Sequence, residues 1–164
     1  NIMVVEKEQI ISDTILIKSS NIKNNIDGYI QYYMKNKYED KCYENGYIIP
    51  NSLEIVNRSY GKLTMIDDIS YLKYEITYKV KSIIPTVGDI YTCTVDNLTK
   101  MGALGYLDYN SCILETSPII FIIPNESLKD NDNISIGDKL RVKILDIRIK
   151  FMKKQIQVVA EINT

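Results

Sequence analysis

Residues 71–95 read YLKYEITYKVKSIIPTVGDIYTCTV, and within this stretch the pattern of the chain changes. Between Tyr71 and Val80 apolar and polar side chains alternate, which predicts a strand with one buried face and one solvent-exposed face. Proline and glycine then punctuate residues 84–88, and an all-β pattern begins immediately afterwards. We therefore place a domain boundary here and predict two domains, over residues 1–84 and 85–164.

The half before this boundary predicts a strand followed by a helix. Residues 14–18 form a short β-branched run, and Ser19 and Ser20 then provide the expected N-cap of the helix. The helix is expected to end near Lys37, and short strands are expected at residues 47–49 and 53–57. The apolar positions that trace one helical face are Ile22, Ile26, Tyr29, Ile30 and Tyr33.

The half after the boundary is rich in short segments with the composition of strands. Pro124 ends one of them, and residues 125–128 are expected to form a single helical turn. Short strands with one helical turn before the last hairpin predict a five-stranded Greek-key barrel, the OB-fold. The segments cover residues 90–95, 102–109, 112–114, 119–123, 139–149 and 155–162.

Residues 139–154 carry seven basic side chains and one acidic side chain, so their local charge is seven minus one, or +6. Apolar residues occupy even positions up to Ile144 and odd positions from Leu145 onward, and this switch predicts a β-bulge between the two residues. The bulge would keep Leu145, Ile147, Ile149 and Phe151 facing inward. The side chains expected to point outward are Arg141, Lys143, Arg148 and Lys150.

An outward row of cations on an OB-fold is typical of a protein that tracks the backbone of single-stranded RNA, with aromatic rings on which bases stack. Tyr91 shares a face with Cys93 and Val95 and is therefore interpreted as a core residue. A solvated face, or an edge strand protected by lysine, is the alternative interpretation of the basic row. The candidate RNA-binding residues are Tyr106, Tyr109, Arg141, Lys143, Arg148, Lys150, Lys153 and Lys154.

The composition argues against several other classes of protein. With no histidine in the sequence, the commonest general base is missing, and the adjacent carboxylates at 39–40 and 67–68 are interpreted as solvated turn residues. Three cysteines, Cys42, Cys93 and Cys112, are too few for a four-ligand zinc site and are expected to be small buried hydrophobes. We therefore expect that the chain is not an enzyme by itself and that it has no metal, no cofactor and no membrane partner.

The order of these features resembles the stalk subunit of archaeal and eukaryotic RNA polymerases, the seventh subunit of the eukaryotic enzyme. It comprises a strand, a helix, Lys41-Cys42, a Gly-Tyr-Ile-Ile strand at 46–49, a glycine loop, the alternating strand and a Val-Gly-Asp step at 87–89 into the barrel. The resemblance covers roughly residues 12 to 162 and implies an α+β protein, with an N-terminal RNP-like tip domain followed by a C-terminal five-stranded OB-fold β-barrel.

The resemblance also implies partners and contacts. The large RNA polymerase subunits would receive the tip domain beside the clamp, a small helical stalk subunit is the usual further partner, and single-stranded RNA would be contacted by the barrel. By position, the contacts with the polymerase core would fall on the turn after the first strand and on the glycine loop. These residues are Ser19, Ser20, Asn21, Ile22 and Lys23, and Ser59, Tyr60, Gly61, Lys62 and Leu63.

Two departures from that family pattern stand out. Glu39-Asp40-Lys41-Cys42 replaces the frequent Glu-Gly-Lys-Cys, and Gly102 is followed by Ala103 where an aromatic residue is usual. These differences and the composition typical of an AT-rich genome would suit a copy from a large DNA virus, located in the virion and host cytoplasm, whereas a cellular eukaryotic copy would be nuclear. A free-standing, translation-factor-like OB-fold RNA-binding protein is the alternative function.

Overall fold

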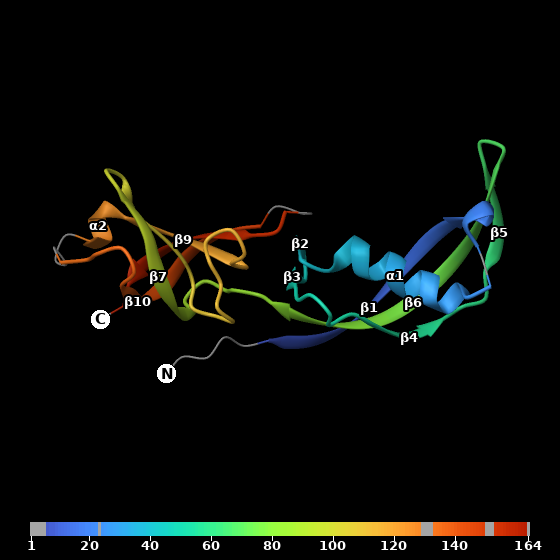
Figure 1. Cartoon of the computed structure of the whole chain (residues 1–164), viewed down its shortest axis with the longest axis horizontal. Helices are drawn as coiled ribbons and strands as arrows, with labels where there is room; N and C mark the ends of the chain where they lie inside the picture. The colour runs from blue at the N-terminus through green and yellow to red at the C-terminus, as the bar shows by residue number, and fades with distance from the viewer. Residues whose placement is uncertain (1–5, 23, 129–132, 150–152, 164) are drawn as a thin grey trace. The chain divides into compact units, whose positions relative to one another are not determined.

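The structure is a computed structural model that describes residues 6–22, 24–128, 133–149 and 153–163. The chain forms two compact units, each described by itself (Figure 1). The sheet unit comprises residues 7–40 and 48–82. The barrel unit comprises residues 41–47 and 83–164, with Glu6. Residues 41–47 thus belong with the barrel, which the sequence did not indicate, and the domain boundary after residue 84 remains a prediction.

The first sheet is built around β6 (Ile69–Ile83), and β1 (Lys7–Lys18) pairs antiparallel with one edge of β6 from Lys7↔Ser82 to Lys18↔Tyr71. The other edge of β6 pairs with β4 (Glu54–Arg58) and β5 (Lys62–Ile66). Two short strands, β2 (Lys41–Tyr43) and β3 (Gly46–Ile48), complete the order β1-β6-β3-β2. The predicted alternation on β6 is confirmed, because Tyr74, Ile76, Tyr78 and Val80 are buried.

The helix α1 (Ile26–Tyr38) lies along this sheet and buries Ile30 and Met34 (Figure 1). Its start differs from the prediction: Ser19–Asn21 is a single 3-10 turn, η1, and the N-cap is Asn25, whose side chain accepts from the Gly28 backbone N–H at 3.0 Å. The physical reason is that the Ser19 hydroxyl is bonded instead to the Ser70 hydroxyl, at 2.8 Å. Asn is as good a cap as Ser.

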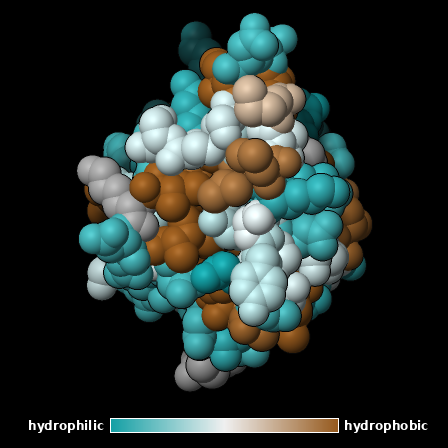
Figure 2. Space-filling model, turned by 90° about the vertical axis from the view of Figure 1, so that its right-hand side faces the viewer, coloured by the Kyte–Doolittle hydropathy of each residue, from teal (hydrophilic) through white to brown (hydrophobic). Residues whose placement is uncertain are grey.

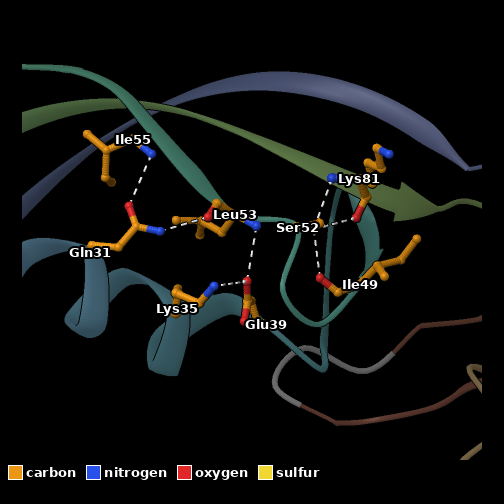
Figure 3. Close-up of polar contacts among 8 residues, drawn as sticks. All are labelled: Gln31, Lys35, Glu39, Ile49, Ser52, Leu53, Ile55 and Lys81. Atoms are coloured by element: carbon orange, nitrogen blue, oxygen red, sulfur yellow. Dashed lines mark hydrogen bonds and ion pairs between the residues drawn. The ribbon is translucent and has the colours of Figure 1, made fainter.

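Polar side chains fasten residues 49–55 to α1 and to β6 (Figure 3). The Gln31 amide donates to the Leu53 carbonyl at 2.8 Å, and the Glu39 carboxylate accepts from the Leu53 N–H at 3.0 Å. The Ser52 hydroxyl donates to the Ile49 carbonyl and accepts from the Lys81 N–H. Glu39 therefore has a structural role, and because its side chain is only 11% exposed, its interpretation as a solvated turn residue is wrong.

Five strands close into a barrel in the order β10-β11-β9-β8-β7, which confirms the predicted five-stranded barrel. Only β11 and β9 pair in parallel. The predicted helical turn is α2 (Asn125–Leu128), between β9 and β10. The strand bounds are β7 (Ile90–Thr99), β8 (Gly102–Leu107), β9 (Ile119–Pro124), β10 (Lys139–Arg148) and β11 (Ile156–Ile162).

The barrel interior is apolar, with Phe121 and Ile144 fully buried at its centre. The strand predicted at residues 112–114 is wrong: this segment forms turns, in which the Cys112 N–H donates to the Tyr109 carbonyl and the Thr116 N–H to the Ile113 carbonyl. These local bonds take up backbone groups that a strand would use in a ladder.

The described residues are mostly β, with few helices. The α+β class and the RNP-like character of the first unit therefore remain predictions. Neither described α-helix combines the length and the apolar content that crossing a membrane requires.

Candidate functional site

The β-bulge predicted in the basic segment is present in β10. Ile144 pairs with Ala160 and Asp146 with Val159, so Leu145 is the extra residue. Leu145 is 45% exposed, which corrects its predicted inward orientation. The reason is that the inserted residue of a bulge lies outside the ladder, so its side chain is free to turn away from the interior. Ile147 and Ile149 are half-buried, and Phe151 lies outside the described residues.

The bulge leaves the predicted cations on the outside of the barrel. Arg141, Lys143 and Arg148 are exposed, whereas Val142 and Ile144 between them are buried. Lys143 pairs in register with Glu161, and Arg148 pairs with Gln157. Lys150 lies outside the described residues.

The two candidate stacking tyrosines lie on or just after β8, which is one strand away from β10 through β7. In the closed barrel β8 is separated from β10 by β7 on one side and by β9 and β11 on the other. Tyr106 on β8 is half-buried between Thr94 and Ile120. Tyr109 donates its hydroxyl to the Glu6 carboxylate, and its pKa is raised, chiefly by burial. Because paired residues share a face, Tyr106 lies on the same outer face as Arg141, with β7 between them.

Two further positions on the barrel strands are internal. Tyr91 is 8% exposed and packs against Phe121, with ring centroids 5.9 Å apart, as the core interpretation requires. Burial is also the main cause that raises the pKa of Tyr91 to about 12. Ala103, which follows Gly102 where the stalk family usually has an aromatic residue, is 3% exposed. This position faces the barrel interior and could not present a stacking ring to solvent.

A concave pocket of about 340 Å³ lies beside the start of β11. It brings together three of the cations that the sequence singled out, with a carboxylate and two amides that it did not. Three positive charges and one negative charge give the lining a net charge of +2. The lining residues are Glu115, Arg148, Lys153, Lys154, Gln155 and Gln157.

The pocket is built on fixed backbone. The Gln155 side chain donates to the Leu114 carbonyl at 2.6 Å, which ties the loop before Glu115 to the start of β11. The Ile156 N–H donates to the Pro118 carbonyl at 2.8 Å, and the Ser117 hydroxyl donates to the Ile119 carbonyl at 2.6 Å. The loop that carries Glu115 is thus held at both of its ends.

Three charged side chains of this pocket take no part in the polar contacts among the described residues. With the residues that the structure describes, the side chains of Glu115, Arg148 and Lys153 make no hydrogen bond or ion pair. Only a weak sequence signal indicated the lining residues that were not among the predicted RNA-binding residues. Gln157 occupies an outward position of β11 opposite Arg148, whereas Glu115 is distant in sequence and joins the pocket only through the fold.

The two segments predicted to contact a polymerase core lie at the same end of the sheet unit. Both flank residues 70–73 of β6: the Ser19 hydroxyl meets the Ser70 hydroxyl, and Leu63 pairs with Leu72. Tyr71 of β6 pairs with Lys18 of β1 on one edge of the strand and with Thr64 of β5 on the other edge. Lys23 lies outside the described residues. The structure therefore brings together two segments about 40 residues apart in sequence.

The hairpin that joins β5 to β6 exposes apolar side chains at this end. Asp67 and Asp68 both have positive φ, 51° and 62°, as a type I′ turn requires, so the carboxylate pair is a turn, as predicted. Figure 2 looks onto this end and shows apolar surface among polar side chains. Four exposed side chains form what we call the apolar hairpin: Leu63 (65% exposed), Met65 (61%), Ile66 (42%) and Ile69 (41%).

Two residues of the glycine loop have structural roles. The Ser59 hydroxyl accepts from the Glu75 N–H at 2.9 Å. A Cβ atom at Gly61 would lie 2.8 Å from the hydroxyl of Tyr74, a side chain that is only 4% exposed. Tyr60, by contrast, is 94% exposed. Tyr60, Lys62 and Leu63 are therefore the members of this loop whose side chains are exposed.

Comparison with known proteins gives one informative similarity. No protein-family model matches the chain. The chain is 22% identical over 167 residues to a protein of Acanthamoeba polyphaga mimivirus that is named a putative DNA-directed RNA polymerase subunit. The similarity spans 93% of this chain and 79% of that protein. The name specifies the enzyme but not the position of the subunit within it.

Proposed function

We propose that this chain is a non-catalytic stalk subunit of a multisubunit DNA-dependent RNA polymerase encoded by a large DNA virus. The named polymerase subunit of mimivirus, similar over almost the whole chain, supports the enzyme and the type of source. The order of elements, with a sheet unit before a closed five-stranded barrel, supports the stalk position. The strand order and the helix between β9 and β10 fit an OB-fold.

The observation that carries this proposal is the apolar hairpin. Leu63 and Met65 are both more than 60% exposed on one face of β5, and Ile66 and Ile69, which pair with each other beside the turn, are exposed on the other face. A cluster of exposed apolar side chains on a small protein marks a site of interaction with another protein. The hairpin lies at the end of the sheet unit where both predicted core contacts meet, so this RNP-like tip would dock on the large polymerase subunits.

The barrel unit supplies the second part of the proposal, contact with emerging RNA. Arg148, Lys153 and Lys154 converge on one pocket, and cations that neutralise phosphates give affinity for single strands without base reading. A free-standing RNA-binding protein would share this pocket. It would have no use for the apolar hairpin, and this difference favours the stalk over the alternative.

A matched pair of variants tests the docking surface. Met65→Glu places a charge in the apolar hairpin, and Met101→Glu places the same charge at an 84% exposed position of the β7–β8 turn in the barrel unit. Each tagged variant is expressed in the native source, and the yield of co-purified large polymerase subunits is measured relative to the parent chain. Met65→Glu should lower that yield at least about tenfold, because a desolvated charge in an interface costs more than ~1.4 kcal/mol. Equal yields for the two variants would remove the hairpin from the interface.

A further inference from the structure

The pocket beside β11 contains a group that a simple phosphate site does not need. We infer that it binds one nucleotide of single-stranded RNA, with Arg148 and Lys153 on the phosphate and Glu115 accepting a hydrogen bond from the amino group of the base, so that cytosine is preferred to uracil. This inference rests on the proposed RNA contact and adds base selectivity to it. Backbone tracking alone would give little dependence on sequence.

The size of the pocket suits a small ligand. At about 340 Å³ it lies at the lower end of the range of roughly 300–1,000 Å³ that is typical of small-molecule sites. Its walls come from the end of β10, the start of β11 and the loop that carries Glu115. A single nucleotide presents its phosphate and its base edge on different sides, which matches a lining with cations and a carboxylate.

The cationic side of the pocket is complementary to phosphate. Arg148 is held on β10 by its pairing with Gln157, and its planar guanidinium can form two parallel hydrogen bonds with phosphate oxygens. Lys153 contributes a second positive charge to the same pocket. Neither side chain has a partner among the described residues, so both are available to an anion.

The carboxylate of Glu115 makes the pocket more than an anion site. An ionised carboxylate only accepts hydrogen bonds, so it would repel a phosphate and would weaken a site whose sole ligand was the RNA backbone. Cytosine offers an N4 amino donor at the position where uracil offers the O4 acceptor. Glu115 therefore attracts the edge of cytosine and repels that of uracil, and it is the specificity-determining group of the pocket.

The amides of the pocket have separate tasks. Gln155 is already committed through its amide nitrogen to the Leu114 carbonyl, so it positions the loop that carries Glu115. Gln157 is exposed opposite Arg148 and is free to bond the ribose. The described lining residues are all polar or charged.

The test compares short oligocytidylate and oligouridylate RNA, each fluorescently labelled, in binding titrations with the full chain at one ionic strength. The parent should bind oligocytidylate about fivefold more tightly, the low end for a hydrogen-bonded base contact because the pocket is open to water. Glu115→Gln should remove this preference, since an amide can serve both bases. Because the substitution also removes a negative charge, the ratio of the two affinities is the readout. Glu126→Gln, an exposed glutamate of α2 outside the pocket, should keep the parental ratio.

The outcomes separate this inference from the proposed function. Equal affinity of the parent for both oligonucleotides would overturn the base reading and leave the RNA contact standing. No binding of either would overturn both. A cytosine preference that survives Glu115→Gln would show that Glu115 does not read the base. If Glu115→Gln changed only the ratio of RNA affinity to DNA affinity, Glu115 would be assigned to the ribose hydroxyl. This result would also overturn the inference.

Discussion

The salt dependence of RNA binding distinguishes a phosphate pocket from a continuous basic row along β10. The perturbation is the double variant Arg148→Gln and Lys153→Gln, which removes the two pocket cations that have no described partner. The matched control is Arg141→Gln and Lys143→Gln, which removes two exposed charges from the same strand outside the pocket. Both doubles change the net charge equally, so any difference between them reports position rather than charge.

The expected magnitude follows from the number of RNA phosphates that the variant no longer neutralises. Each neutralised phosphate on a single strand contributes about 0.7 to the slope of log affinity against log salt, so removing two cations should reduce the slope by about 1.4. Over a fourfold rise in salt, from ~50 to ~200 mM, the affinity of the pocket variant should fall about sevenfold less than that of the parent. The control should keep the parental slope to within about 0.3.

Fluorescence anisotropy with a labelled single-stranded RNA at several salt concentrations gives the slopes directly. Circular dichroism of each double variant checks that the barrel is retained, which is expected because the exchanged side chains are exposed. An unchanged slope for the pocket variant would refute the assignment of phosphate binding to Arg148 and Lys153. Equal reductions for the pocket variant and the control would favour the continuous row.

Three further predictions concern the fold. Asp68→Gly should stabilise the chain by about 0.5–1 kcal/mol, raising its melting temperature by about 2 °C in calorimetry, because glycine tolerates the positive φ of this turn. Gly61→Glu should destabilise the chain by about 1–3 kcal/mol through contact with Tyr74, whereas Tyr60→Glu should stay within about 0.5 kcal/mol; equal effects in urea unfolding would contradict this. The pKa of Tyr91 is raised from 10 to about 12 in the folded chain, so the protonated hydroxyl contributes stability that is complete below pH 10. This contribution is lost as the pH rises toward about 12. The free energy of unfolding should therefore fall less over this pH range in Tyr91→Phe than in the parent.

Much of the barrel could be predicted from the sequence because its signals are local. Apolar alternation defines the strands, and the change of parity after Ile144 located the bulge that the structure contains. The residue of the bulge itself was misjudged. The alternation of apolar and polar residues indicates only which way each half of β10 faces. Leu145 lies between the two halves and has no partner in β11 that would fix its orientation.

Other errors arose where two local signals competed. Ser19 and Asn25 are both good caps, and the choice between them depends on Ser70, which is distant in sequence and occupies the Ser19 hydroxyl. Residues 112–114 have β-forming composition, but hydrogen bonds within residues 109–116 close turns there instead. Propensity alone does not decide such cases, because the competing partner is supplied by the fold.

The candidate site was predicted in part for the same reason. Arg148, Lys153 and Lys154 are close in sequence, so their charge was visible as a cluster, and the structure does bring them to one pocket. Glu115 joins them through the closure of the barrel, which no local pattern reports. The same closure leaves β7 between Tyr106 on β8 and Arg141 on β10, a separation that composition alone does not report.

Assembly into RNA polymerase is the central claim, and affinity purification of the tagged parent chain from its native source tests it most directly. The eluate is washed at moderate salt, treated with nuclease so that RNA cannot bridge proteins, and analysed by quantitative mass spectrometry. The account predicts that the two largest polymerase subunits are recovered in near-stoichiometric amounts with the chain. Recovery of the chain without any large polymerase subunit, under conditions in which the active enzyme is present in the same lysate, would contradict it.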